Sequence, residues 1–341
     1  MNPHVAVFLI CLFLYTCPPA GLAQAAGNNK DSQDLADARS LLTAGKLDEA
    51  IMRLKPLAQR QPPVRGAAHE IGTAYYQKNE FNEAIANLKQ ALAEDPHDDE
   101  AVQLLGLAYH FVGRPGEAIP LLERVQSWYP SANVDASYVL GMCYVQTKDF
   151  DHARKAFAIM YDVSVDSAAA YLFTARMLLR QELGAAAEDY AHKSITIDPK
   201  LPLAHFFLGE IYLAKSNIPD AIAEFRKELA VNPGHAASYY KLADADSRLL
   251  KFEDAQKLLE QSIWLDDTSS GPYILMGKVL LKKNELELAI RTLQHALAMD
   301  PNNYIAHHLL GEVYRAQGKS EDASRELKMS DQLQTTQTPR R

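Results

Sequence analysis

The residue types that most often ligate metal ions or act in catalysis are spread along the chain and form no motif. The sequence contains no Cys-x-x-Cys pair, no glycine-rich phosphate loop and no complete His-Glu-x-x-His motif. His69-Glu70 begins such a motif, but Thr73 stands where the second histidine is required. His307 and His308 are adjacent, so on a helix they point about 100° apart and cannot easily share a metal ion. We therefore expect no metal site, no cofactor and no enzymatic activity.

The three cysteines give no reason to expect a disulfide. Cys11 and Cys17 lie in an apolar amino-terminal segment, and Cys143 stands alone in the rest of the chain. A single cysteine cannot form an internal disulfide, so the fold does not depend on oxidation. Cys143 is predicted to be a small, buried, apolar residue.

A repeating pattern organises the rest of the chain and predicts the elements that position any functional residue. In residues 203–233, two apolar helical faces are separated by a Ser216-Asn217 break. The same frame recurs every 34 residues, with one residue inserted around 130–135. A small residue recurs in the first helix, at Ala38, Gly72, Gly106, Gly141, Ala175, Gly209, Ala243, Gly277 and Gly311. An alanine recurs in the second helix, at Ala50, Ala84, Ala118, Ala153, Ala187, Ala221, Ala255, Ala289 and Ala323. Larger side chains there would overpack by roughly 1–3 kcal/mol, so the two helices of each repeat are predicted to approach closely.

This pattern resembles the tetratricopeptide repeat in its period, its small and aromatic positions and its closing prolines. The resemblance covers most of the chain and implies an all-α fold. It implies an αα-solenoid, a right-handed superhelix of nine helix–turn–helix units over residues 34–332. The family's tryptophan four residues before the glycine column is absent, and Tyr171, Tyr239 and Tyr273 are the nearest substitutes. The fourth repeat lacks a closing proline and the fifth departs most from the pattern, which indicates either a hinge or ordinary drift between repeats.

The two ends of the chain differ from the repeats in composition. Residues 5–17 are apolar and are followed by small residues, a pattern typical of a secretory signal peptide over residues 1–25. The apolar run is shorter than the roughly 20 residues of a membrane span. Residues 26–33 are predicted to form a linker, and residues 333–341 a disordered tail. The protein is therefore expected to be exported, either periplasmic or secreted, with an uncleaved membrane anchor as the alternative.

The charge balance argues against nucleic acid as a partner. The chain carries 35 Lys and Arg against 43 Asp and Glu, a formal net charge of −8, with the two signs interspersed. Binding to phosphates requires clustered Lys and Arg, which this chain lacks. The expected partner is another protein or peptide, and membrane association would come through a partner or a retained anchor.

In the family that the chain resembles, the first helices line a concave groove. Four columns of the repeat are predicted to face it: three residues before the small first-helix residue, and one, four and five after it. The candidate partner-binding residues from these columns are Leu107, His110, Phe111, Tyr138, Met142, Val145, Leu172, Arg176, Leu179, Phe206, Glu210, Leu213 and Tyr240. They predict an exposed apolar stripe, which is typical of an interaction site. The alternative is that these side chains pack between neighbouring helices.

These features predict a non-catalytic scaffold or assembly factor that binds a polypeptide segment in the groove, outside the cytoplasm. Two alternatives remain open, a holdase-like chaperone for exported proteins and an accessory subunit of an envelope enzyme complex. A scaffold would hold one partner with slow dissociation, whereas a holdase would suppress aggregation of unrelated clients. An enzyme subunit would change its partner's turnover.

Overall fold

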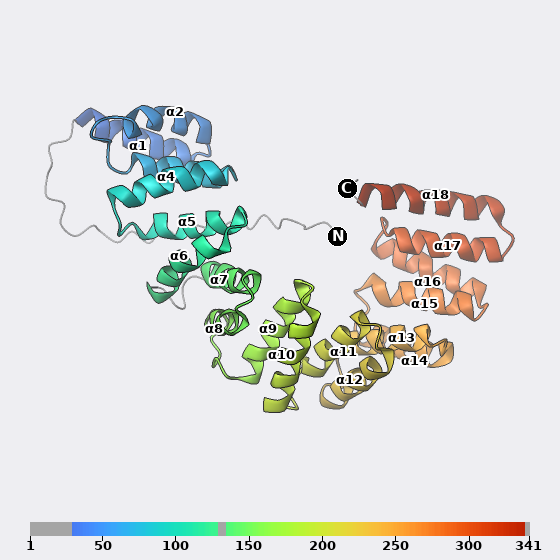
Figure 1. Cartoon of the computed structure of the whole chain (residues 1–341). Helices are drawn as coiled ribbons and strands as arrows, with labels where there is room; N and C mark the ends of the chain where they lie inside the picture. The colour runs from blue at the N-terminus through green and yellow to red at the C-terminus, as the bar shows by residue number, and fades with distance from the viewer. Residues whose placement is uncertain (1–28, 129–133, 338–341) are drawn as a thin grey trace. The chain divides into compact units, whose positions relative to one another are not determined.

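The computed structural model describes residues 29–128 and 134–337, and the predicted signal peptide lies outside these ranges. The described residues form eighteen α-helices and no strand (Figure 1). The helices are α1 (Asn29–Thr43), α2 (Leu47–Ala58), α3 (Ala67–Gln77), α4 (Phe81–Glu94), α5 (Asp99–Phe111), α6 (Pro115–Trp128), α7 (Val134–Gln146), α8 (Phe150–Met160), α9 (Ala168–Arg180), α10 (Gly184–Ile197), α11 (Ala204–Ala214), α12 (Ile218–Val231), α13 (Ala236–Arg248), α14 (Phe252–Leu265), α15 (Ser270–Lys282), α16 (Leu286–Met299), α17 (Tyr304–Ala316) and α18 (Ser320–Gln337). The all-α solenoid prediction is confirmed.

Two predicted boundaries were wrong. The linker expected at residues 26–33 is already helical from Asn29, and the tail expected from residue 333 stays helical to Gln337. Apart from Leu333, the residues in both places are polar, so no apolar periodicity revealed the helix. Among the described residues, no helix is both long and apolar enough to cross a membrane.

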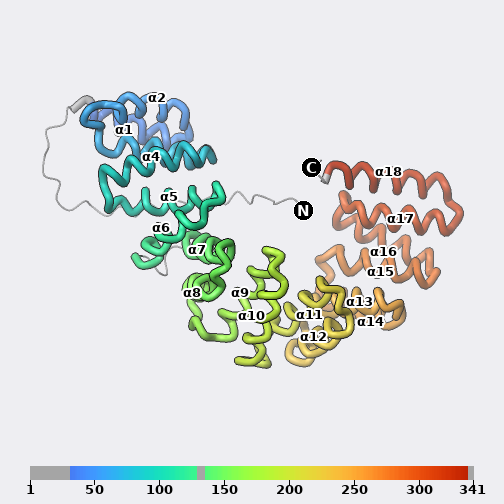
Figure 2. The backbone as a smooth tube through the Cα atoms, viewed as in Figure 1, coloured from blue at the N-terminus to red at the C-terminus, as the bar shows by residue number. Residues whose placement is uncertain are grey.

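The chain divides into two compact units, and the boundary falls inside α10, between Tyr190 and Ala191. The amino-terminal unit contains α1 to α9 and the start of α10, and the carboxyl-terminal unit contains the rest of α10 and α11 to α18 (Figure 2). This boundary lies in the fifth repeat, which the sequence marks as the least regular. From α1 to α8 and from α11 to α18, the two helices of each repeat contact each other. In the same repeats, the second helix contacts the first helix of the repeat that follows it.

The small residues of the first helix mark the closest approach between the helices of a repeat. A Cβ atom placed on Gly141 would lie 2.3 Å from Cε1 of Phe157, and one on Gly209 would lie 2.6 Å from Cε1 of Phe225. Gly72 and Gly106 face leucines in the same way. The alanines of the second-helix column are all buried. The predicted close packing of the two helices is therefore confirmed.

The turn inside each repeat is closed by one recurring backbone motif. The second residue after the end of the first helix has a positive φ in all nine repeats, at Gly45, Asn79, Gly113, Lys148, Glu182, Ser216, Leu250, Asn284 and Gly318. In the second repeat the Glu80 amide donates to the Tyr75 carbonyl at 2.9 Å, and the Asn79 amide donates to Tyr76 at 3.0 Å. This pair of hydrogen bonds satisfies carbonyls at the helix end that would otherwise lack donors. The turn therefore fixes how the second helix folds back against the first.

Candidate binding surface

Most of the predicted apolar stripe is buried. The buried members are Leu107, Met142, Val145, Leu172, Phe206 and Leu213, each exposed by 9% or less. The expectation that they form one exposed stripe was therefore wrong. The physical reason is that first helices of consecutive repeats contact one another, α3 with α5, α5 with α7 and α11 with α13, so the columns between these helices are covered. Phe206 and Leu213 accordingly share a buried cluster with residues of α13.

The other predicted residues keep some or much of their surface accessible. Phe111 is 54% exposed and Tyr138 is 37% exposed. The half-buried members are His110, Arg176, Leu179, Glu210 and Tyr240. Glu210 forms an ion pair with Lys241 at 2.9 Å. Phe111 and Tyr138 are thus the two predicted groove residues with large accessible aromatic surfaces, and both belong to the amino-terminal unit.

Three rings from the second and third repeats form an aromatic patch, made of Tyr76, Phe81 and Phe111. Phe111 stacks on Phe81 with ring centroids 4.6 Å apart and planes 12° apart. Tyr76 meets the edge of Phe81 at 5.6 Å and lies 6.3 Å from Phe111. Phe81 was missed by the sequence analysis because it is the first residue of α4 and belongs to no first-helix column. The patch holds Phe111 in a fixed orientation although half of its surface is exposed.

Cys143 is buried, as predicted, and its Sγ lies 3.4 Å from Nδ1 of His110. Burial raises the pKa of the Cys143 thiol to about 12, and burial lowers the pKa of His110. Both groups are therefore neutral at neutral pH. Because a thiolate is needed for reactivity, this pair is not an activated nucleophile.

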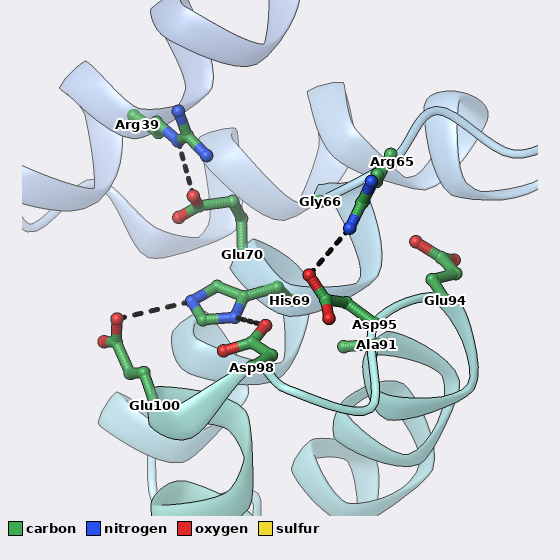
Figure 3. Close-up of a pocket in the computed structure, with 10 residues that line it drawn as sticks. All are labelled: Arg39, Arg65, Gly66, His69, Glu70, Ala91, Glu94, Asp95, Asp98 and Glu100. Atoms are coloured by element: carbon green, nitrogen blue, oxygen red, sulfur yellow. Dashed lines mark hydrogen bonds and ion pairs between the residues drawn. The ribbon is translucent and has the colours of Figure 1, made fainter. Parts of the chain in front are cut away.

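A cavity of about 420 Å³ opens at the other end of α3 and α5, and it is called the ionic cavity below (Figure 3). Its lining residues are Arg39, Arg65, Gly66, His69, Glu70, Ala91, Glu94, Asp95, Asp98 and Glu100. Three ion pairs cross the cavity between repeats. Arg39 pairs with Glu70 at 2.5 Å, Arg65 with Asp95 at 2.7 Å, and His69 with Asp98 at 2.6 Å (Figure 3). The cavity therefore joins the first three repeats through charged side chains.

His69 lies between two carboxylates in this cavity. Its Nδ1 contacts Asp98, and its Nε2 lies 3.6 Å from Glu100. Burial alone would lower the pKa of His69, but the hydrogen bond and the charges of Asp98 and Glu100 outweigh burial and raise it to about 10. Burial would raise the pKa of Asp98, yet His69 and the amide of Ala101 hold it below its usual range. His69 is thus a cation at neutral pH.

The backbone of α5 contributes to the same site. Asp98 caps this helix, because its Oδ1 accepts a hydrogen bond from the Ala101 amide at 3.0 Å. One carboxylate therefore begins α5 and also binds His69 on α3. Across the described ranges, no group of His, Cys, Asp and Glu side chains is arranged to hold a metal ion.

Family profiles match parts of the chain. A profile described as "TPR repeat" matches residues 72–113 and 277–318, and one described as "Tetratricopeptide repeat" matches residues 112–176. The chain is 25% identical over 281 residues to the Hsp70-Hsp90 organizing protein of Triticum aestivum, covering 79% of this chain and 46% of that protein. It is 24% identical over 243 residues to the TPR repeat-containing protein YpiA of Bacillus subtilis (strain 168), covering 69% of this chain and 56% of that one. The chain thus spans less than two thirds of these relatives' lengths.

Solved structures with similar folds share little sequence with this chain. The APC/C hetero-tetramer Cut9-Hcn1 aligns with a TM-score of 0.46 and 20% identity, covering 84% of this chain and 57% of that one. YrrB, described as a TPR protein with an unusual peptide-binding site, aligns with a TM-score of 0.43 and 20% identity. That alignment covers 50% of this chain and 87% of YrrB.

Proposed function

Because the chain is a tetratricopeptide repeat protein, we propose that it is a non-catalytic scaffold or assembly factor. Proteins of this family generally act as protein–protein interaction scaffolds. In this proposal, first helices of the amino-terminal unit bind a segment of another polypeptide. The protein works outside the cytoplasm, in the periplasm or after secretion, in keeping with the apolar start of the chain.

The observation that carries this proposal is the exposure of Phe111 and Tyr138. Large aromatic side chains are normally buried, and those left accessible are enriched at binding surfaces. Phe111 exposes 54% of its surface although Phe81 stacks on it, so half of its area is available to a partner. The two residues lie on α5 and α7, consecutive first helices that contact each other.

Burial of most of the predicted stripe favours a specific scaffold over a holdase. A holdase that binds unrelated clients needs a broad accessible apolar surface. Six of the apolar groove residues are covered by neighbouring helices, so the accessible aromatic area is confined to a few positions. A partner that binds here must place its own side chains at defined points.

Site-specific photo-crosslinking tests the proposal. A photoreactive phenylalanine analogue placed at Phe111 or Tyr138 should crosslink the full-length protein to one discrete partner in cells. Met52, which is 71% exposed on a second helix of the same unit, is the matched control and should not capture that partner. Equal capture from all three positions would refute binding along the first helices. Capture of many unrelated proteins from Phe111 would favour the holdase.

A further inference from the structure

The ionic cavity and the aromatic patch lie at opposite ends of one helical face. On α3, His69 lines the cavity and Tyr76 belongs to the patch, seven residues later. Seven residues turn an α-helix by almost two full turns, so both side chains leave the same face about 10 Å apart. On α5, Glu100 lines the cavity and Phe111 belongs to the patch. The two helices together therefore present an acidic end and an aromatic end.

The ionic cavity holds more acid than base. Five carboxylates line it against two arginines and the charged His69. Glu100 keeps 55% of its side chain exposed and lies 3.6 Å from His69, beyond hydrogen-bond distance. Glu94 accepts a hydrogen bond from Gln90 through Oε1, but its buried Oε2 has no partner among the described residues. The cavity is therefore suited to a cationic group with several hydrogen-bond donors.

A second unpartnered polar atom lies between the two ends. Thr73 follows His69 by one helical turn on α3, and its buried Oγ1 has no hydrogen-bond partner in the described part of the chain. Buried polar atoms in proteins nearly always form a hydrogen bond, either with another protein atom or with ordered water. A buried polar atom without such a bond therefore marks a place where a bound group could supply one. The unpaired Oγ1 of Thr73 thus lies on α3 between the two ends, and the unpaired Oε2 of Glu94 lies at the cavity, at the end of α4.

We propose that this face binds an extended peptide segment carrying a basic residue and, about three to five positions away, an aromatic or large apolar residue. The basic side chain enters the ionic cavity, and the apolar side chain covers Phe111. The spacing follows from geometry, because an extended chain advances about 3.3 Å per residue. The two ends are about 10 Å apart along α3, from His69 to Tyr76, and about 16 Å apart along α5, from Glu100 to Phe111. The assignment rests on the proposed function, of which it defines the partner's chemistry.

Fluorescence anisotropy with synthetic peptides tests the assignment on the full-length protein. The probes are labelled Gly/Ser peptides with one Arg and one Trp placed one to six positions apart, and a matched set with Glu in place of Arg. We expect the tightest binding at a spacing of about three to five. The Arg peptide should bind at least about tenfold more tightly than its Glu counterpart, and this preference should shrink as salt rises. Equal binding at all spacings, or of both peptide sets, would overturn the assignment.

Three variants assign the two ends separately. Glu100→Lys should weaken the Arg peptide and strengthen the Glu peptide, each about tenfold, and the half-exposed position tolerates the change. Phe111→Ala should weaken the Arg–Trp peptide about tenfold and leave an Arg–Ala peptide unchanged. Glu83→Lys, at an exposed position of α4, makes the same change of charge and is the matched control; it should change the binding of neither peptide. A Glu100→Lys variant with the wild-type preference would refute a cation in the cavity.

The results of the peptide-binding experiment can be distinguished from those of the crosslinking experiment that tests the proposed function. If Phe111 crosslinks a discrete partner in cells but none of the peptides shows the expected preference, the scaffold remains and the basic–aromatic specificity is wrong. If neither experiment gives a positive result, both proposals fail. Circular dichroism of each variant checks that the helices are retained.

Discussion

Replacing Gly141 with alanine should destabilise the fourth repeat, and the structure gives the magnitude. The new Cβ atom would lie 2.3 Å from Cε1 of Phe157 and 2.7 Å from Cδ1 and Cζ. Carbon atoms in contact are about 3.5 Å apart at the closest, so the ring has to move by about 1.2 Å. Phe157 is fully buried, so the ring has no open space to move into. Overpacking of this kind costs about 1–3 kcal/mol, and the better helix propensity of alanine returns about 1 kcal/mol. The 2.3 Å contact places the cost at the upper end of this range, so the expected net loss is about 2 kcal/mol.

Gly116→Ala is the matched control for this prediction. Gly116 lies in the first turn of α6 and is exposed, and a Cβ atom placed on it would have no other atom within 4 Å. The same substitution there should stabilise the protein by about 0.5–1 kcal/mol, because alanine restricts the unfolded chain and favours the helix. The two Gly→Ala changes should therefore have opposite signs.

The assay has to resolve single repeats, because repeat proteins lose and gain stability unit by unit. Urea unfolding followed by circular dichroism gives the overall change, and hydrogen exchange locates it. Faster exchange should appear in α7 and α8. A Gly141→Ala variant as stable as the wild type, with unchanged exchange in both helices, would refute the reasoning that close contact excludes the side chain.

Three further predictions follow from single side chains. Leu250→Gly should stabilise the protein by about 1 kcal/mol in urea unfolding, because Leu250 is 73% exposed and its backbone is left-handed at φ 61°. Because the pKa of His69 is raised, the free energy of unfolding of the wild type should exceed that of His69→Gln by its full amount below pH 6.5, and this difference should decline as the pH rises to about 10. A difference in the free energy of unfolding that does not change with pH would contradict this. Phe206→Ala should cost about 3–5 kcal/mol, because Phe206 packs on Phe225 and His235, whereas exposed Phe111→Ala should cost about 1 kcal/mol.

The repeat architecture was predictable because its constraints act within one repeat. The close contact of Gly209 with Phe225 joins two residues of the same unit, so it recurs at a fixed spacing in the sequence. The left-handed turn residues recur for the same reason, although lysine and leucine, the residue types at Lys148 and Leu250, do not by themselves predict a left-handed backbone. Because the same local geometry recurs in nine repeats, the sequence pattern predicts the fold even where the residues of one repeat depart from it.

The binding surface was less predictable because exposure depends on the next repeat. Leu107 and Phe111 both occupy columns predicted to face the groove, yet Leu107 is 5% exposed and Phe111 is 54% exposed. The ionic cavity was missed for a related reason. Its ion pairs join residues 29 to 31 positions apart, as in His69–Asp98 and Arg39–Glu70, and such pairs belong to no single column. Oppositely charged residues 29 to 31 positions apart in the sequence would have predicted these ion pairs.

The small first-helix residue and the second-helix residue that faces it, sixteen positions later, are related in side-chain volume. Two of the three first-helix alanines, Ala38 and Ala243, have leucine sixteen positions later, at Leu54 and Leu259, and each pair lies in one buried cluster. The third, Ala175, has Ala191 at that position. Phenylalanine occurs at this second position only opposite glycine, at Phe157 and Phe225. Phe157→Leu should therefore rescue part of the Gly141→Ala defect, and a double-mutant cycle should give a coupling energy of about 1–2 kcal/mol. Additive effects would contradict direct contact between the two side chains.

The histidines differ in whether their carboxylate partner lies in the same repeat or in the next one. This difference, and not the presence of a histidine, identifies the candidate site. His205 and His307 occupy the family's tryptophan column, and each pairs with a glutamate nineteen residues later, Glu224 at 2.6 Å and Glu326 at 2.7 Å. Both pairs join the two helices of one repeat, α11 with α12 and α17 with α18. His69 instead binds Asp98 of the next repeat and lines a cavity. Changing His205 should therefore affect the stability of one repeat, whereas changing the carboxylates around His69 should alter what the surface binds.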